Sequence, residues 1–199
     1  MTTPLLHVLG DSISMQYGPY LEKMLQGVMH YSRKLPASTE PDSANGGDSS
    51  MALAYLRERI GQAPTFDVLL LNCGLHDIKH NPGVDGTQVA LADYPGNLRA
   101  MLALAGQHKV RVVWVRTTPV ADEIHNSRSA SFKRYNADVL AFNAAADQVM
   151  AEAGVAVIDL YTFTANLGPD LYIDHVHFND AVRMQQAAFI GGRLFSLAD

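Results

Sequence analysis

The chain has 199 residues, of which 48% are hydrophobic and 18% are charged, and its formal net charge is −5. This length and composition suit one folded domain with a substantial core, and they exclude an intrinsically disordered chain. The sequence carries no basic stripe that could neutralise phosphates, so we expect no nucleic-acid partner. Its apolar runs have the length of strands, so we expect no membrane-spanning segment.

The single cysteine, Cys73, excludes an internal disulfide and a cysteine-based zinc site. The first residues, Met-Thr-Thr-Pro-Leu-Leu-His, lack the basic and apolar regions of a signal peptide. We therefore expect a cytoplasmic protein. Nothing in the sequence fixes its oligomeric state.

Short apolar runs alternate with longer segments of helical spacing. The runs are almost continuously apolar, and those at 110–115 and 155–160 are rich in β-branched residues. This favours strands buried on both faces of a parallel sheet, with helices crossing between them. The predicted strands cover 5–9, 66–73, 110–115 and 155–160, with a weaker fifth at 29–33. The predicted helices cover 51–60, 88–105, 132–153 and 181–197. No repeat or linker divides the chain, so residues 1–199 are expected to form a single doubly wound α/β domain.

The first helix is expected to break at Gly18-Pro19. Pro19 would then restart it, because proline is well tolerated in the first turn of a helix. The residues expected to face the core are Tyr20, Leu21, Met24 and Leu25. The polar stretches 36–50 and 79–86 are predicted to be loops.

Ligands of an open parallel sheet bind outside the carboxyl ends of its strands. The segments after the predicted strands are Gly10-Asp11-Ser12, Gly74-Leu75-His76-Asp77, Thr117-Thr118-Pro119 and, at a distance, Asp174-His175-Val176-His177. A serine becomes a nucleophile when a histidine takes its proton, and that histidine needs a carboxylate to fix its tautomer. Ser12, His177 and Asp174 meet these demands. Donors for an oxyanion are available from the backbone of Ser12, from the glycine-rich turn at Gly47, and from the ring of His76.

Four blocks of sequence resemble those of the SGNH (GDSL-type) hydrolases, in the same order: Gly10-Asp11-Ser12-Ile13, Gly47 followed by Asp-Ser-Ser, Gly74-x-His76-Asp77, and Asp174-x-x-His177. The resemblance implies a flavodoxin-like α/β/α sandwich with a five-stranded parallel sheet, and an esterase, lipase, thioesterase or carbohydrate acetylesterase activity. It also implies Ser12 as nucleophile and first oxyanion donor, Gly47 as second donor, and Asp174 and His177 as orienter and base.

The third block departs from the family pattern. The family usually places an asparagine, its last oxyanion donor, where this chain has His76. A neutral imidazole also carries one N–H, so we hypothesise that His76 keeps the donor role. Were the ring protonated, its state would depend on pH near neutrality.

Several alternatives remain open at this point. Ser12 could simply cap the first helix, and Gly46-Gly47 could be a flexible turn. The acids and histidines around His76 and His177 could be taken for a metal site, but no metal-binding spacing supports one, and we expect neither metal nor cofactor. Cys73 and Trp114 are expected in the core. Tyr17 and Tyr20 either line an acyl pocket or pack inside.

The sequence thus predicts a serine esterase that forms an acyl-Ser12 intermediate. With no lid-like apolar insertion, short acyl groups are favoured as substrates, such as acetyl on a carbohydrate or another small molecule. An acyltransferase using the same site is the main alternative. A non-catalytic flavodoxin-like binding module ranks lower, because Asp11 in the first loop would repel a phosphate.

Overall fold

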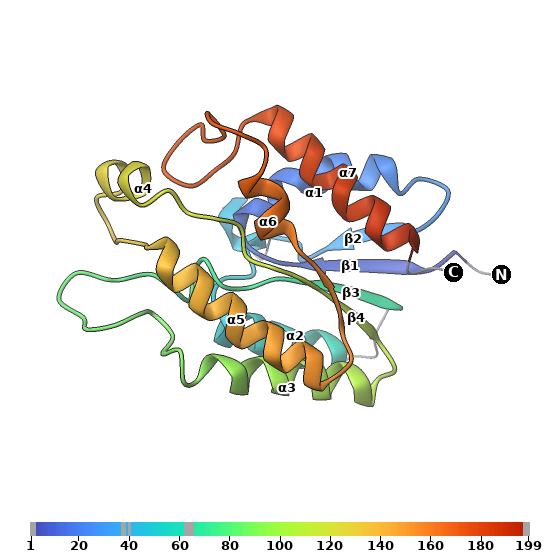
Figure 1. Cartoon of the computed structure of the whole chain (residues 1–199). Helices are drawn as coiled ribbons and strands as arrows, with labels where there is room; N and C mark the ends of the chain where they lie inside the picture. Colours follow the sequence, from blue (N-terminus) through green and yellow to red (C-terminus); the bar gives the residue numbers. More distant parts are fainter. Residues whose placement is uncertain (1–2, 37–38, 40, 62–65, 197–199) are drawn as a thin grey trace.

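The computed structural model describes residues 3–36, 39, 41–61 and 66–196. A sheet of five parallel strands lies between two layers of helices (Figure 1). The strands are β1 (Leu5–Leu9), β2 (His30–Arg33), β3 (Val68–Leu71), β4 (Arg111–Val115) and β5 (Ala156–Ile158). Their order in the sheet is β2-β1-β3-β4-β5. The predicted α/β class, the flavodoxin-like layering and the five parallel strands are confirmed.

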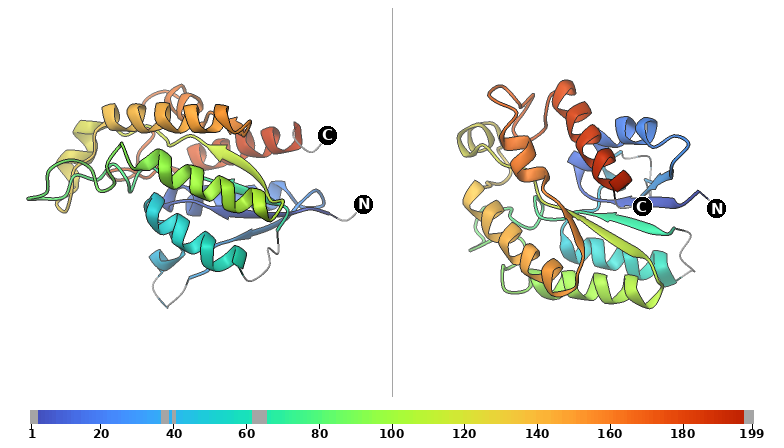
Figure 2. Two further views of the ribbon diagram at one scale, coloured as in Figure 1. Left: turned by 90° about the horizontal axis from the view of Figure 1, so that it is seen from below. Right: turned by 45° about the vertical axis from the view of Figure 1, so that its right-hand side comes forward.

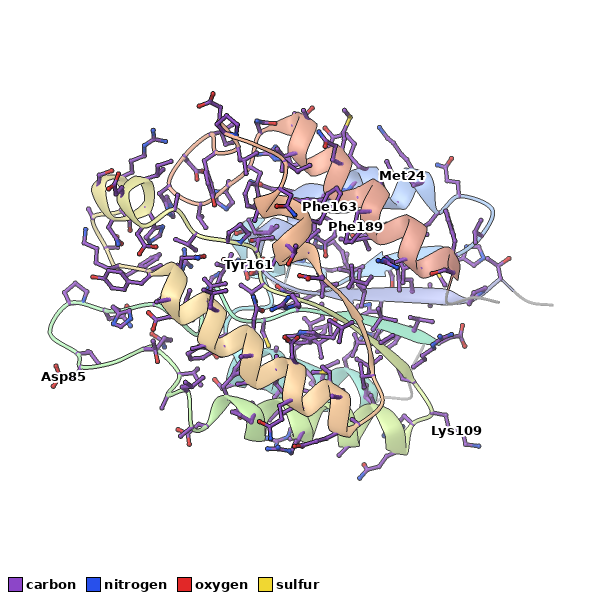
Figure 3. All side chains as sticks on the ribbon, viewed as in Figure 1. Met24, Asp85, Lys109, Tyr161, Phe163 and Phe189 are labelled. Carbon is purple, nitrogen blue, oxygen red and sulfur yellow. The ribbon has the colours of Figure 1, made fainter. Side chains whose placement is uncertain are left out.

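Helices cover both faces of the sheet, as the two further views in Figure 2 also show. One layer consists of α1 (Ser12–Met24), α6 (Leu160–Ala165) and α7 (Asp180–Ser196). The other consists of α2 (Ser49–Gly61), α3 (Tyr94–Gln107) and α5 (Asn136–Glu152). The 3-10 helix η1 (Pro41–Ala44) and α4 (Asp122–Arg128) lie in connecting segments. In Figure 3, Phe163 of α6 lies beside Phe189 of α7, and their stacked rings are 4.2 Å apart between centroids.

The core follows from the sheet order. β3 is buried along its whole length, because it is the central strand and both of its faces are covered by helices. Trp114 on the neighbouring β4 and Cys73 just beyond β3 are fully buried, as predicted.

The first helix differs from the prediction. α1 is continuous from Ser12 to Met24, with Pro19 inside it. Proline removes one backbone donor, but packing of the apolar face of α1 along α7 stabilises the helix across that gap. Gly18 has a packing role, because a Cβ there would lie 2.6 Å from the hydroxyl of Tyr31. Met24, predicted to face the core, is 40% exposed and lies at the surface (Figure 3).

The bounds of other elements also differ from the prediction. The predicted helix 88–105 begins only at Tyr94, with Pro95 in its first turn, and the predicted helix 132–153 begins only at Asn136. The strand predicted to reach residue 160 ends at Ile158, because the carboxylate of Asp159 accepts from the N–H of Thr162 and starts α6. The last helix begins at Asp180, and residue 197 lies outside the described residues.

The carboxyl ends of the strands form one rim of the molecule. The loop after β3, helix α4 and the long loop before α7 all lie at this end, on the left in Figure 1. The segments that the sequence singles out therefore lie at one edge of the sheet, where open parallel sheets bind ligands. Among the described residues, no helix is long and apolar enough to cross a membrane.

Candidate active site

Ser12 is the first residue of α1 and lies just beyond the carboxyl end of β1. The cap of this helix is Asp11, whose carboxylate accepts a hydrogen bond from the N–H of Ile13 at 2.9 Å. The alternative that Ser12 caps the helix is therefore wrong, because Asp11 already satisfies that N–H. The Ser12 hydroxyl is available for another partner, and it lines the cavity at the rim.

That partner is a histidine and carboxylate pair from the loop before α7. The Oγ of Ser12 lies 2.9 Å from Nε2 of His177, 165 positions away in the chain, and Nδ1 of the same ring lies 2.6 Å from Oδ2 of Asp174. When Nδ1 donates to the carboxylate, the neutral ring has no proton on Nε2, which accepts the serine O–H. The fold thus brings together the three residues that the sequence assigns to nucleophile, base and orienter.

Asp174 is itself fixed by its own loop. Its Oδ1 accepts hydrogen bonds from the N–H groups of Val176 and His177, both at 2.8 Å. Burial raises the pKa of Asp174, but these two bonds, together with the bond to the His177 ring, outweigh burial and lower that pKa to about 2. The carboxylate is therefore ionised at neutral pH and positioned to orient His177.

The neighbouring His175 has a different partner. Its Nδ1 lies 2.9 Å from Nδ1 of His125, a buried residue of α4. Burial, with a smaller effect from Arg134, lowers the pKa of His125 to about 4. His125 is therefore neutral at pH 7. The histidine that contacts Ser12 is His177.

The turn before α2 holds Gly47 with a φ of 73°, in the left-handed region that favours glycine. A Cβ at this position would lie 2.6 Å from the sulfur of Met51. The N–H of Gly47 donates to Oδ1 of Asn45 at 2.9 Å, which closes an Asx turn. This N–H, a predicted oxyanion donor, is thus already bonded within its own turn.

His76 follows β3 and lies beside Asn45. Nδ2 of Asn45 is 3.3 Å from Nε2 of His76. Because Oδ1 of the same amide accepts from Gly47, the amide nitrogen faces the ring, so Nε2 accepts and the ring proton sits on Nδ1. Burial, followed by the charges of Lys79 and Arg134, lowers the pKa of His76 to about 3. The ring is therefore neutral near pH 7 rather than pH-sensitive there.

Two buried contacts hold the segment after β3 in place. The carboxylate of Asp77 accepts from the N–H of Ser49 at 2.9 Å and so joins this segment to the start of α2. Gly74 approaches Thr117 so closely that a Cβ on it would lie 2.2 Å from the threonine hydroxyl oxygen. Burial raises the pKa of Asp77 to about 7, although its bonds to Ser49 oppose this shift. Asp77 is a positioning residue in this arrangement.

The site opens into a cavity of about 380 Å³. Its described lining residues are Ser12, Met15, Gln16, Asn45, Leu75, His76, Lys79, Phe132, Arg134, His175, Val176 and His177. The sequence did not predict a role for the side chain of Asn45, or for the group formed by Lys79, Phe132 and Arg134. No signal identified Phe132 or Arg134, because both fall in a segment predicted as helix.

Other candidate residues are structural. Tyr17 is 2% exposed, and the hydroxyl of Tyr20 donates to Asp180 of α7 at 2.5 Å, so neither lines the cavity. Cys73 is buried, which raises the pKa of its thiol well above the ordinary range. Across the ranges that the structure describes, no group of three or more His, Cys, Asp or Glu side chains is placed to hold a metal ion.

A model of the GDSL-like lipase/acylhydrolase family matches residues 8–182. The chain belongs to this family. The GDSL hydrolase is accordingly an enzyme that cleaves esters, which excludes the alternative of a non-catalytic binding module. Among curated proteins, none matches the chain significantly.

Solved structures share the fold over nearly the whole chain. A lipase/acylhydrolase from Enterococcus faecalis superposes with a TM-score of 0.73 at 17% identity, covering 96% of this chain and 95% of that one. The psychrotrophic esterase EstA from Pseudoalteromonas sp. gives 0.69 at 15% identity, covering 98% of each chain. A carbohydrate acetylesterase from Sinorhizobium meliloti gives 0.69 at 12% identity, covering 98% of this chain and 99% of that one. At these identities the likeness extends to the fold alone.

Proposed function

We propose that this GDSL hydrolase cleaves carboxylic esters through an acyl-enzyme on Ser12. The observation that carries the proposal is the hydrogen-bonded chain from Ser12 Oγ through the His177 ring to the Asp174 carboxylate, with distances of 2.9 and 2.6 Å. These distances lie within the range in which a base takes a proton from a nucleophile.

In the first half-reaction, Ser12 Oγ attacks the carbonyl carbon of the ester while His177 Nε2 takes the hydroxyl proton. The bond between that carbon and the alcohol oxygen then breaks, and His177 returns the proton to the departing alcohol. Asp174 stabilises the transient imidazolium through Nδ1. The acyl group is left on Ser12.

In the second half-reaction, His177 takes a proton from a water molecule that attacks the acyl carbon. The bond between that carbon and Ser12 Oγ breaks, and the proton on His177 passes to Ser12. The products are a free carboxylic acid and the restored enzyme. The same base thus serves both halves, in line with the contact between His177 and Ser12.

We further propose that the oxyanion is held by the N–H of Ser12 and by the linked group of Gly47, Asn45 and His76. Gly47 holds the amide oxygen of Asn45, and Nε2 of His76 accepts one of its two amide N–H groups. The second N–H of that amide is left to donate to the oxyanion. Asn45 thereby supplies the amide donor that the family takes from its third block, and His76 acts by orienting it.

The substrates that we propose are short acyl esters, such as acetyl groups on a carbohydrate or another small molecule. A cavity of about 380 Å³, which must also hold the alcohol part, leaves limited room for a long acyl chain. The fold neighbour from Sinorhizobium meliloti, a carbohydrate acetylesterase, adds support by analogy.

The test is the turnover of p-nitrophenyl esters with acyl chains from two to twelve carbons, with acetylated sugars measured beside them. We expect kcat/KM to be highest for the shortest chains, free acid as the product, and loss of activity in Ser12→Ala. Ser14→Ala, one position beyond Ile13 on the same helix, is the matched control. Preference for long chains, or an active Ser12→Ala variant, would contradict the proposal.

A further inference from the structure

Two positively charged side chains, Lys79 and Arg134, line the cavity that contains Ser12. His80 and Lys133 form an antiparallel bridge, with their N–H and C=O groups bonded both ways at 2.9 and 3.0 Å. Lys79 precedes His80 and Arg134 follows Lys133, so the antiparallel register of the bridge places the two cations opposite each other. Like charges that lie opposite each other repel and destabilise the folded chain, so another interaction must offset this repulsion.

The ring of Phe132 contacts both cations. Its ring centroid is 4.8 Å from Nζ of Lys79 and 4.7 Å from Cζ of Arg134. Contact with an aromatic ring offsets part of the hydration that each cation loses. All three side chains line the cavity that contains Ser12 and His177.

Arg134 is nearly inaccessible, with 3% of its surface exposed. Its Nε donates to the carbonyl oxygen of Leu75 at 2.6 Å, and its backbone N–H and C=O are both bonded to the side chain of Asn126. The guanidinium is thus held in one position. Burial lowers the pKa of Arg134 to about 10, with a weaker opposing effect from Asp11. It therefore keeps its charge at neutral pH.

Among the side chains that the structure describes, neither cation has a direct ion-pair partner. The ion pairs in this part of the chain involve other residues, and none of its carboxylates lies within 4.0 Å of Lys79 or Arg134. Asp11, whose charge affects Arg134, is engaged as the cap of α1. Asp48 and Asp77 influence Lys79, but each accepts hydrogen bonds at the start of α2.

A buried charge without a partner is costly, and proteins retain it where a ligand supplies the missing partner. Here the cavity carries two cations and no acid among its described lining residues, although the whole chain has a net charge of −5. A guanidinium beside an ammonium suits the oxygens of a carboxylate or phosphate group.

We propose that Lys79 and Arg134 form a subsite for a negatively charged group of the substrate, so that the enzyme acts on esters of anionic molecules. The subsite rests on the proposed function, because it shares its cavity with Ser12. It narrows the substrate class from short acyl esters in general to those that also carry a carboxylate or phosphate.

The test compares pairs of esters that differ in charge. One arm sets O-acetylated glucuronic acid against O-acetylated glucose, and a second sets O-acetylated glucose 6-phosphate against the same neutral sugar. A third arm places the charge on the acyl side, with monomethyl succinate against dimethyl succinate. We expect kcat/KM to be about 10- to 100-fold higher for an anionic member, as for hydrogen bonds to charged groups. The arm with the largest ratio identifies the anion and the side of the ester that carries it.

Lys79→Gln is the primary variant, because Lys79 is half-buried and its replacement need not disturb the core. It should lower kcat/KM for the anionic member, and with it the charge preference, about tenfold. Lys109→Gln removes one positive charge at the far end of the molecule (Figure 3), and it should keep the full preference. Raising the ionic strength should weaken the preference of the parent enzyme, because Lys79 is partly open to solvent.

A second readout does not depend on turnover. Titration calorimetry of the Ser12→Ala variant with glucuronate, glucose 6-phosphate and glucose should show binding of an acid and weaker binding of the neutral sugar. Equal kcat/KM for the charged and neutral members in all three arms would overturn the subsite, as would a preference that persists unchanged in Lys79→Gln. If no ester of either kind is hydrolysed, the proposed function fails, and the calorimetry alone then decides the anion subsite.

Discussion

The substitution Asp174→Asn should remove most of the activity while leaving the fold intact. In the structure, Oδ1 of Asp174 accepts from two backbone N–H groups, and Oδ2 contacts Nδ1 of His177. An asparagine amide has one oxygen, and the two N–H groups will hold it in the position of Oδ1. Its NH₂ group must then face Nδ1 of His177, which becomes the acceptor.

This exchange places the ring proton of His177 on Nε2, facing Ser12. A ring in that tautomer cannot take the serine proton, so the base is lost without loss of any side chain. For a serine protease triad, the same change lowers kcat about 10⁴-fold, which corresponds to roughly 5.5 kcal/mol in activation free energy. We expect a fall in kcat of this order for p-nitrophenyl acetate, with little change in KM.

Asp180→Asn is the matched control, because Asp180 opens the next helix and bonds Tyr20 away from the cavity. It should keep full activity. Both variants should unfold at temperatures within a few degrees of the parent, since the local backbone bonds survive. An Asp174→Asn variant that retains kcat within tenfold of the parent would refute the assignment of Asp174 as the residue that sets the tautomer.

Two further predictions concern the oxyanion donors and stability at low pH. Asn45→Ala should lower kcat about 10²- to 10³-fold, and adding His76→Ala should cost little more, because the two act as one unit; full activity in Asn45→Ala would instead favour direct donation by the Gly47 N–H. His7 is 2% exposed, and burial, then the charges of Arg59 and Arg33, lowers its pKa from 6.5 to about 4. Below pH 6.5 the His7 ring is protonated in the unfolded chain but stays neutral in the folded chain down to about pH 4. This difference should lower the free energy of unfolding by about 3 kcal/mol between pH 6.5 and pH 4. Urea denaturation across that range should show a smaller fall in His7→Gln, and an identical fall would contradict the inference.

The fold was largely predictable because a parallel sheet imposes a simple pattern. The leucine-rich runs at β1 and β3 and the valine-rich run at β4 are largely buried, so hydrophobicity alone locates them. The features of the helices that the sequence did not predict depend on tertiary contacts. The continuity of α1 through Pro19 comes from packing along α7, and the late start of α5 comes from pairing of Lys133 with His80. Neither contact is local in the sequence.

The candidate site was predictable where position in the sheet specifies it. Ser12 and the Asp174-x-x-His177 spacing lie at strand ends or just before a helix, so one rim was expected to gather them. The role of Asn45 was hidden, because it depends on two hydrogen bonds that only the folded turn creates. Arg134 was hidden for another reason: a lone arginine in a segment with helical spacing is normally a surface residue.

The central claim, that Ser12 is the nucleophile, is tested most directly by mass spectrometry after treatment with a fluorophosphonate. In the reaction, the serine oxygen displaces fluoride from phosphorus. We expect one adduct, on the peptide that contains Ser12, and none in Ser12→Ala. An adduct on another residue, or labelling that survives in Ser12→Ala, would contradict it.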